Sequence, residues 1–194
     1  RQNEIDRTKR EMLAENDCVF DEDAQLGRLM LKRHLYADSR YGHSTLGTAA
    51  SMARIQLKDI QDFVSQTYTQ SRLVLGCAGD IGDKFFEEQC QQIIQSLPKG
   101  EAVQYPNAPP KHTRQKMVVV HKPSRSQCQL FTGQLIPGCD DAVLLPYQVG
   151  ALVLGGTFSS RLVQQMRVDR GLCYGAYAWL SSERMCGGFF THTD

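Results

Sequence analysis

The sequence of 194 residues lacks any apolar run that approaches the roughly 18–20 residues of a membrane-spanning helix. It also lacks an excess of one charge, because 22 lysines and arginines stand against 21 acidic residues, for a formal net charge of +1. Binding to nucleic-acid phosphates needs a concentrated basic face. We therefore expect no membrane span and no nucleic acid as the main partner.

The cysteines show neither a disulfide framework nor a metal-binding spacing. No C-x-x-C pair occurs, the number is odd and the spacing is irregular, the seven being Cys18, Cys77, Cys90, Cys128, Cys139, Cys173 and Cys186. Disulfide-stabilised small domains carry even numbers of cysteines. We expect mostly buried free thiols, which favours a reducing compartment but leaves one or two disulfides open.

The histidines also lack a metal-binding pattern. No two of them lie four residues apart, and the chain contains neither HxxEH nor its inverted form; the five are His34, His43, His112, His121 and His192. Zinc sites on a helix need two imidazoles on one face. We expect no complete zinc site within these residues, and we place each histidine on the surface or in a loop.

One glycine-rich turn, GCAGDIG at residues 76–82, stands between an apolar run and a helical pattern. A dinucleotide site would show GxGxxG there, followed about twenty residues later by an acidic residue at the end of a second strand. This stretch is GxxGxxG, and the chain is rich in proline where the acidic residue should stand. A plain strand–turn–helix is favoured over nucleotide binding.

Both ends of the sequence favour a piece of a longer protein. The chain begins RQNEIDRTKR, without an initiator Met or an apolar signal core, and it ends GGFFTHTD in what reads as a strand. We expect a soluble fragment whose compartment the sequence leaves unknown.

Hydrophobic periodicity predicts long helices interrupted by separate strands, which is typical of an α+β fold. The helices are expected within 4–34, with a break near 16–23, and over 57–68, 83–97, 142–154 and 159–170. The apolar residues of 57–68 should share one side, and those of 83–97 should face inward. The strands are expected over 72–80, 116–122 and 126–136, from 172, and after 188. The proline-rich stretch 98–114 is the only credible linker.

The helix over 4–15 places Asp6, Glu11 and Glu15 among basic residues. Such a run is usually a solvated face with pairs such as Arg7–Glu11. A metal ligand on this face would need partners from elsewhere.

The stretch MRVDRGLCYGAYAW at 166–179 brings an arginine and a tyrosine to one corner. Gly171 is expected just past the helix end, with Arg167 one turn earlier and Tyr174 in the strand that follows. Arginine near a helix C-terminus often only complements the helix dipole. Alternatively, its charged N–H groups and the phenolic O–H suit a carbonyl oxygen or a developing oxyanion.

The segment FSSRLVQQMRVDRGLCYGAYAWL, followed by GGFF, resembles FSSRLFQ-x-x-R-x-x-RGLAY of the pitrilysin-like zinc metallopeptidases, which include insulysin and the mitochondrial processing peptidases. Upstream, YGHSTLGTAASMARIQLKDIQDFVSQTYTQSRLVLGCAGDI resembles the family's HPYG-x-x-x-LGT region and its continuation. GQLIPGCDDAVLLPYQVGALVLGGTFSSRL is similar to the family's strand–helix–glycine lead-in. The three matches occur in the family's order and cover nearly the whole chain.

The resemblance implies two homologous α+β half-domains with an antiparallel-rich sheet, which close around a peptide or a small unfolded protein. One half binds Zn²⁺ through HxxEH and a downstream glutamate, and the other contributes an arginine and a tyrosine that contact the substrate backbone near the scissile carbonyl. These residues map onto Arg167 and Tyr174. Residues 1–104 would complete the first half-domain, and residues 105–194 would begin the second.

The same register places Glu15 near the family's third zinc ligand, with HxxEH outside this chain. The sequence departs from the family pattern twice: Thr8 stands where the family helix has a further glutamate, and DSRYGHS lacks the family's loop histidine. These departures leave open whether the catalytic half is intact in the parent protein, degenerate or on a partner subunit, and Thr8 favours a parent that is non-catalytic or depends on a partner. The chain alone should hold no zinc and should need a complementary zinc-bearing half-domain or subunit. The alternative is a non-catalytic partner, structural or assembly subunit, as in the core subunits of the respiratory bc1 complex.

Overall fold

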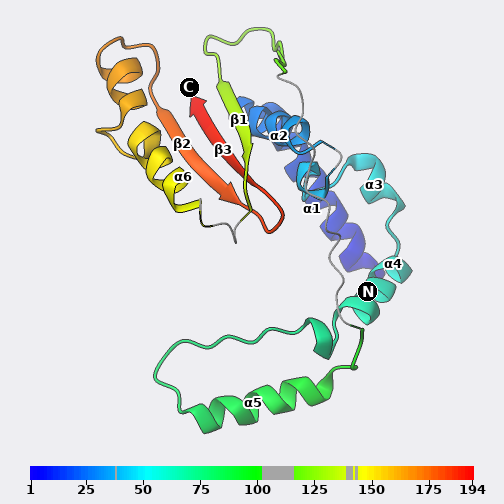
Figure 1. The fold of residues 1–194 in the computed structure, drawn as a ribbon. Helices are drawn as coiled ribbons and strands as arrows, with labels where there is room; N and C mark the ends of the chain where they lie inside the picture. The colour runs from blue at the N-terminus through cyan, green and yellow to red at the C-terminus, as the bar shows by residue number, and fades with distance from the viewer. Residues whose placement is uncertain (38, 102–115, 139–141, 143) are drawn as a thin grey trace. The chain divides into compact units, whose positions relative to one another are not determined.

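Figure 1 shows a computed structural model of the chain that describes residues 1–37, 39–101, 116–138, 142 and 144–194. These residues belong to two compact units. Unit 1 comprises Arg1–Arg10 and Ala50–Pro106, and unit 2 comprises Glu11–Ala49 and Asn107–Asp194. The helix α1 (Gln2–Asp21) contributes its beginning to unit 1 and its remainder to unit 2.

Unit 2 contains a three-stranded antiparallel sheet in the order β1–β3–β2, formed by β1 (Leu130–Ile136), β2 (Ala176–Ser182) and β3 (Gly187–Thr193). Thr193 of the central strand pairs with Leu130 on one side and with Ala176 on the other. Figure 1 shows β3 between its two neighbours. The α+β fold with an antiparallel sheet that the sequence predicts is therefore confirmed.

The core of unit 2 lies on the sheet face that α2 (Asp23–Leu35) covers. Leu35 at the end of α2 packs there with Tyr36 and Phe190, both of which are almost completely buried. The rings of Trp179 and Phe190 stack across β2 and β3 with their centroids 5.5 Å apart. Alternation along the central strand buries every second side chain, which explains why Phe190 and His192 face the helix.

The segment 116–129 before β1 is not the strand that MVVV predicts. Met117 is 86% exposed, and no ladder forms among the described residues of this stretch. Polar contacts hold it instead: Lys122 Nζ donates to the carbonyl oxygens of Phe20 and Asp21 at the end of α1, both at 2.9 Å. The hydrogen bond and charge of Lys122, with the charge of Arg125, also lower the pKa of Asp23.

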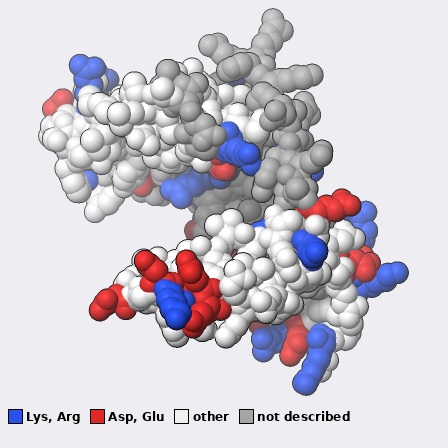
Figure 2. All heavy atoms as spheres, turned by 60° about the horizontal axis from the view of Figure 1, so that its bottom comes forward, with Lys and Arg blue, Asp and Glu red and all other residues white. Residues whose placement is uncertain are grey.

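Charges of both signs are interspersed on the face drawn in Figure 2. The view therefore shows no broad basic area, and the absence of a nucleic-acid partner stays a prediction. No helix in the described part of the chain combines the length and the apolar composition that a membrane crossing requires.

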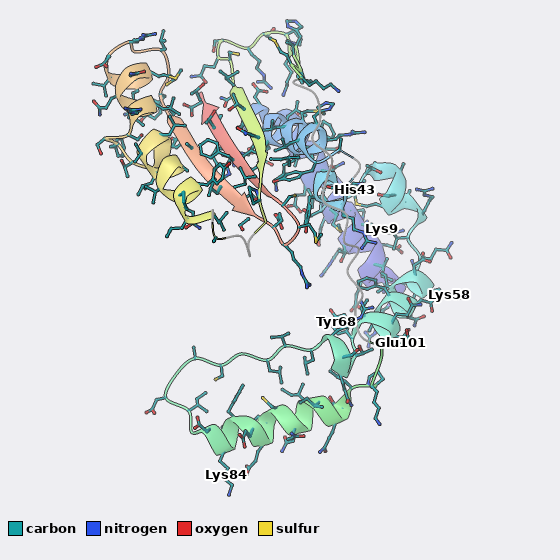
Figure 3. The ribbon with its side chains drawn as sticks, viewed as in Figure 1. Lys9, His43, Lys58, Tyr68, Lys84 and Glu101 are labelled. Atoms are coloured by element: carbon teal, nitrogen blue, oxygen red, sulfur yellow. The ribbon has the colours of Figure 1, made fainter. Side chains whose placement is uncertain are left out.

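Unit 1 consists of short helices joined by loops, which are α3 (Ala49–Arg54), α4 (Leu57–Thr67), η2 (Gln70–Arg72) and α5 (Asp83–Ser96). The helices α4 and α5 confirm the sequence prediction, whereas the sequence pattern does not predict α3 and η2. Figure 3 labels Lys9, whose ammonium group donates to the carbonyl of Ile55, and Lys84 at the start of α5. Gln70 binds the end of α5 twice, through N–H to Pro98 O at 2.9 Å and through Nε2 to Leu97 O at 2.7 Å.

Three expectations for the first hundred residues are wrong. The run 72–80 forms no strand in the described residues, and Val74 is 93% exposed because no neighbouring strand pairs with it. The apolar residues of α5 do not all face inward, since Phe85 and Ile93 are exposed. The helical break is the single residue Glu22, so α1 continues to Asp21 through most of the expected break.

The remaining elements of unit 2 include the helical segment that contains Arg167. They are α6 (Leu144–Ala151), the π-helical segments η3 (Leu152–Gly156) and η4 (Val163–Val168), and the short turn η1 (Arg40–Gly42). Gly155 in η3 touches the backbone of β2, since a Cβ atom there would lie 2.4 Å from Ala178 N. Only glycine fits this contact, which fixes α6 and η3 against the edge of the sheet.

Candidate functional site

Arg167 is the penultimate residue of η4 and lies about one turn before Gly171. The backbone here is wider than an α-helix: the N–H of Asp169 donates to Gln164 O at 2.8 Å, a bond that spans five residues. Gly171 ends the segment with φ +58°, and its N–H donates to Arg167 O at 3.2 Å. This is the left-handed cap that the sequence predicts for Gly171.

Tyr174 lies just before β2, which begins at Ala176 and not at Leu172 as expected. Its backbone N–H donates to Asp194 O at 3.1 Å, and the N–H of Gly175 donates to the Asp194 carboxylate at 2.5 Å. The tyrosine is therefore held beside the end of β3 while its side chain remains 77% exposed. The expected alternation continues along the strand, where Ala176 and Ala178 are buried.

The structure brings Arg167 and Tyr174 together. The guanidinium carbon of Arg167 lies 5.0 Å from the centroid of the Tyr174 ring, within the range of a cation–π interaction. In the described part of the chain, the Arg167 side chain makes no hydrogen bond or ion pair, so its N–H groups remain available. Ring contact orients the guanidinium without using its donors, and the phenolic O–H adds another donor beside them.

Glu15 belongs to no metal-binding group among the described residues. It is exposed on α1, and the described residues contain no group of three or more His, Cys, Asp or Glu side chains that could hold a metal ion. A zinc ion needs three or four such ligands. The described residues therefore do not fit a zinc site, and the assignment of Glu15 as a ligand stays a prediction that depends on residues elsewhere.

His192 corrects the prediction that every histidine lies on the surface or in a loop. It is 4% exposed in β3, its Nε2 lies 2.6 Å from Gln129 Oε1, and its ring stacks on Phe131. Burial first, and then the charge of Arg28, lower the pKa of His192. Alternation of buried and exposed residues in GGFFTHT is the signal that could have predicted this burial. His112 lies outside the described residues.

A hollow of about 560 Å³ opens beside His192, between α2 and the strand β2. Its walls include Arg28, Trp179 and Gly155, and neither Arg167 nor Tyr174 lines it. The Arg–Tyr corner therefore lies outside this hollow.

The cysteines are less buried than expected. Among the described ones only Cys186 is buried, whereas Cys18, Cys77 and Cys128 are exposed. All six described cysteines are unbridged. Burial and the charge of Glu183 raise the pKa of Cys186, which is the behaviour of a structural thiol. Cys139 lies outside the described residues.

Two curated relatives are similar to nearly the whole chain. The non-peptidase homolog YmxG of Helicobacter pylori is 28% identical over 180 residues, which cover 91% of this chain and 40% of that protein. The uncharacterized zinc protease YmxG of Bacillus subtilis is 28% identical over 183 residues, with 93% and 43% covered. The chain thus spans less than half the length of these relatives.

Solved structures agree with the fold. A crystal structure of a peptidase M16 inactive domain from Pseudomonas fluorescens has a TM-score of 0.90 at 28% identity, with all of this chain and 47% of that chain covered. A protease from Helicobacter pylori has a TM-score of 0.85 at 19% identity, with 100% and 48% covered, and supports the fold alone. A family model described as the peptidase M16 inactive domain matches residues 54–194, and the chain belongs to this family.

Proposed function

We propose that this chain is the peptide-binding, non-hydrolytic part of an M16-type protein. Arg167 and Tyr174 bind the backbone carbonyl of an extended peptide. The observation that supports the proposal most is the state of Arg167, whose N–H groups have no partner in the described residues while its guanidinium lies on the Tyr174 ring. A carbonyl oxygen is the acceptor that such donors fit, and a charged donor makes the stronger kind of hydrogen bond.

The zinc-dependent step would belong to a complementary half-domain or subunit. In this arrangement residues 1–104 complete one half-domain, and residues 105–194 begin the half that carries the Arg–Tyr pair. Because the described residues of this chain form no zinc site, no hydrolytic step is assigned to them. Glu15 would serve as a ligand only beside residues that another segment supplies.

A second candidate function is that of a non-catalytic partner or assembly subunit. The name of the matching family, which describes an inactive domain, favours it, as does the non-peptidase relative in Helicobacter pylori. Thr8, which replaces an expected glutamate on α1, points the same way. Such a subunit can retain peptide binding, so the Arg–Tyr proposal does not depend on hydrolysis.

Peptide binding tests the proposal directly. In the full-length protein, Arg167→Ala should weaken binding of a fluorescein-labelled, unstructured peptide of glycine, leucine and serine by about tenfold, the value of a charged hydrogen bond. Fluorescence anisotropy measures this affinity. Arg170→Ala is the matched control, since it removes the same charge from an exposed residue three positions away. Equal effects of the two variants would contradict the proposal.

Hydrolysis separates the two candidate functions. When the protein is combined with a zinc-bearing half, a catalytic assembly should lose about 10²–10³ in rate in both Arg167→Ala and Tyr174→Phe, as for removal of an oxyanion donor. Peptide binding without any hydrolysis in the combined sample would favour the non-catalytic partner. Unchanged turnover in both variants would remove the pair from the mechanism.

A further inference from the structure

A second aromatic ring contacts Arg167. The guanidinium carbon lies 5.4 Å from the centroid of Phe158, close to its 5.0 Å distance from Tyr174. Both rings are 77% exposed. An exposed phenylalanine gains little from the hydrophobic effect, so its packing in unit 2 does not explain its position.

The turn that carries Phe158 is held by several hydrogen bonds. Gln164 Nε2, from η4, donates to Phe158 O at 2.9 Å. The hydroxyls of Thr157 and Ser159 lie 3.1 Å apart, and the N–H of Ser160 donates to Thr157 O at 3.1 Å. The ring therefore projects from a backbone that is tied to the same helical segment as Arg167.

Aromatic contact leaves the guanidinium able to bind. A ring attracts the guanidinium through its π face, whereas the N–H groups of arginine point outward in the plane of the fork. A long arginine side chain loses considerable rotamer freedom when a ligand fixes it. Two rings that already restrict Arg167 reduce the entropy lost on binding.

We propose that Phe158 is a positioning residue for Arg167 and thereby a third member of the peptide-binding corner. The inference rests on the proposed function, because it assigns Phe158 the task of holding the carbonyl-binding guanidinium in place. Phe158 acts through Arg167 and needs no contact with the peptide backbone. The requirement at position 158 is therefore an aromatic ring and not apolar bulk.

The contact between Phe158 and Arg167 can be tested by NMR without any peptide. In full-length protein labelled with ¹⁵N-arginine, the Nε–H signal of Arg167 is assigned by its loss in Arg167→Lys. Phe158→Ala and Phe158→Leu should both move this signal, because each removes one ring current, whereas Phe158→Tyr should leave it nearly unchanged. A signal that stays in place in Phe158→Ala overturns the contact.

Affinity for the labelled Gly/Leu/Ser peptide then tests the consequence. Phe158→Ala should weaken binding about twofold to fivefold, the range expected of one exposed cation–π contact. Phe158→Tyr should bind the peptide as tightly as the unmodified protein, whereas Phe158→Leu should bind it as weakly as Phe158→Ala. Unmodified affinity in Phe158→Leu overturns the aromatic requirement. Leu145→Ala, which truncates another exposed apolar residue of unit 2 and should leave binding unchanged, is the matched control.

The arginine variant keeps this inference distinguishable from the proposed function. If Arg167→Ala weakens peptide binding and Phe158→Ala does not, the role of Phe158 is overturned. Peptide binding by Arg167 is then still supported. Unchanged affinity in both variants would overturn the proposed function, and the positioning role with it. Thermal melting of each variant confirms that the fold is intact, as expected for a side chain this exposed.

Discussion

Two phenylalanine pairs behave differently in the two units. In unit 2 the pair Phe189–Phe190 lies on the central strand, and Phe190 is 2% exposed against α2 and its neighbours. In unit 1 the pair Phe85–Phe86 lies on α5, and Phe85 is 59% exposed. One phenylalanine of the dipeptide is thus a core residue in unit 2 and an exposed residue in unit 1, while Phe86 and Phe189 are both half-buried.

The Arg–Tyr corner depends on the packed core of unit 2. In unit 2 the core, the sheet and α2 together fix the ends of β2 and β3. The backbone N–H of Tyr174 donates to the carbonyl of Asp194, which directly follows β3. In unit 1, hydrogen bonds join the segment at 70–71 to the residues that follow α5: Gln70 Nε2 donates to Leu97 O at 2.7 Å, and Ser71 Oγ donates to Glu101 O at 2.6 Å. We therefore expect the precisely positioned binding residues in unit 2. In unit 1, α5 leaves apolar side chains such as Phe85 and Ile93 exposed.

Truncation of the two phenylalanines gives the largest expected contrast. Phe190→Ala should lower the free energy of unfolding by about 3–5 kcal/mol, because it leaves a cavity in a packed core. Phe85→Ala should change it by less than about 0.5 kcal/mol, as for an exposed residue. Denaturant unfolding of the 194-residue chain measures both.

The same two variants can also be measured in the full-length protein. If Phe85→Ala lowers the free energy of unfolding there as much as Phe190→Ala does, another part of the protein covers the exposed face of α5. If the two variants lower the free energy of unfolding equally in the 194-residue chain itself, the contrast between the units is wrong.

Two glycines of neighbouring turns provide a smaller contrast within unit 2. Gly155→Ala should destabilise by about 1–3 kcal/mol, because the new Cβ would meet the backbone of β2 and force it to move. Gly150→Ala, in α6, meets no atom within 4 Å and should stabilise by roughly 0.5–1 kcal/mol through helix propensity. Thermal denaturation ranks the two variants, and a reversed order would contradict the close approach of η3 to β2.

The smallest expected effect is a pH dependence that His192 brings to unit 2. Burial lowers the pKa of His192 below its ordinary value of 6.5, so the unfolded chain binds a proton more readily than the folded one. Its stabilising contribution is complete above pH 6.5 and is lost as the pH falls below that value. Asp194 opposes the shift, and Arg28 adds to it.

His192→Gln should flatten this dependence, since glutamine does not titrate. Unfolding free energies measured from pH 7 down to pH 5 test it, and an NMR titration of the His192 ring reports its pKa in the folded state. The described part of unit 1 contains no histidine. A residual histidine transition in the variant would therefore originate elsewhere in unit 2 or outside the described residues.

The sequence predicted most of the helices and the last strand, because those elements depend on local pattern. The helices α4 and α5 and the glycine cap at Gly171 follow from local signals in the sequence, and the structure contains all three. The runs LVLGCA and MVVV read as strands but form none, because an apolar run indicates burial and does not supply a pairing partner. Whether such a run becomes a strand depends on residues far away in the sequence.

The candidate site was predictable only in part. Spacing and resemblance singled out Arg167 and Tyr174, and the structure places them in contact. Phe158 was missed because its proximity to Arg167 depends on the hydrogen bond from Gln164 and on the wide turns of η4. Spacing along a regular α-helix does not predict contacts across a π-helical turn.

The wide turns of η4 also make the site sensitive to length. In a regular helix each residue advances the side-chain direction by about 100°, so a single deletion rotates everything beyond it by that amount. A homologue that loses one residue between Val163 and Arg167 could retain every letter of the motif and still direct its arginine away from both rings. The length of this segment is therefore as informative as its sequence when the binding corner is sought in other members of the family.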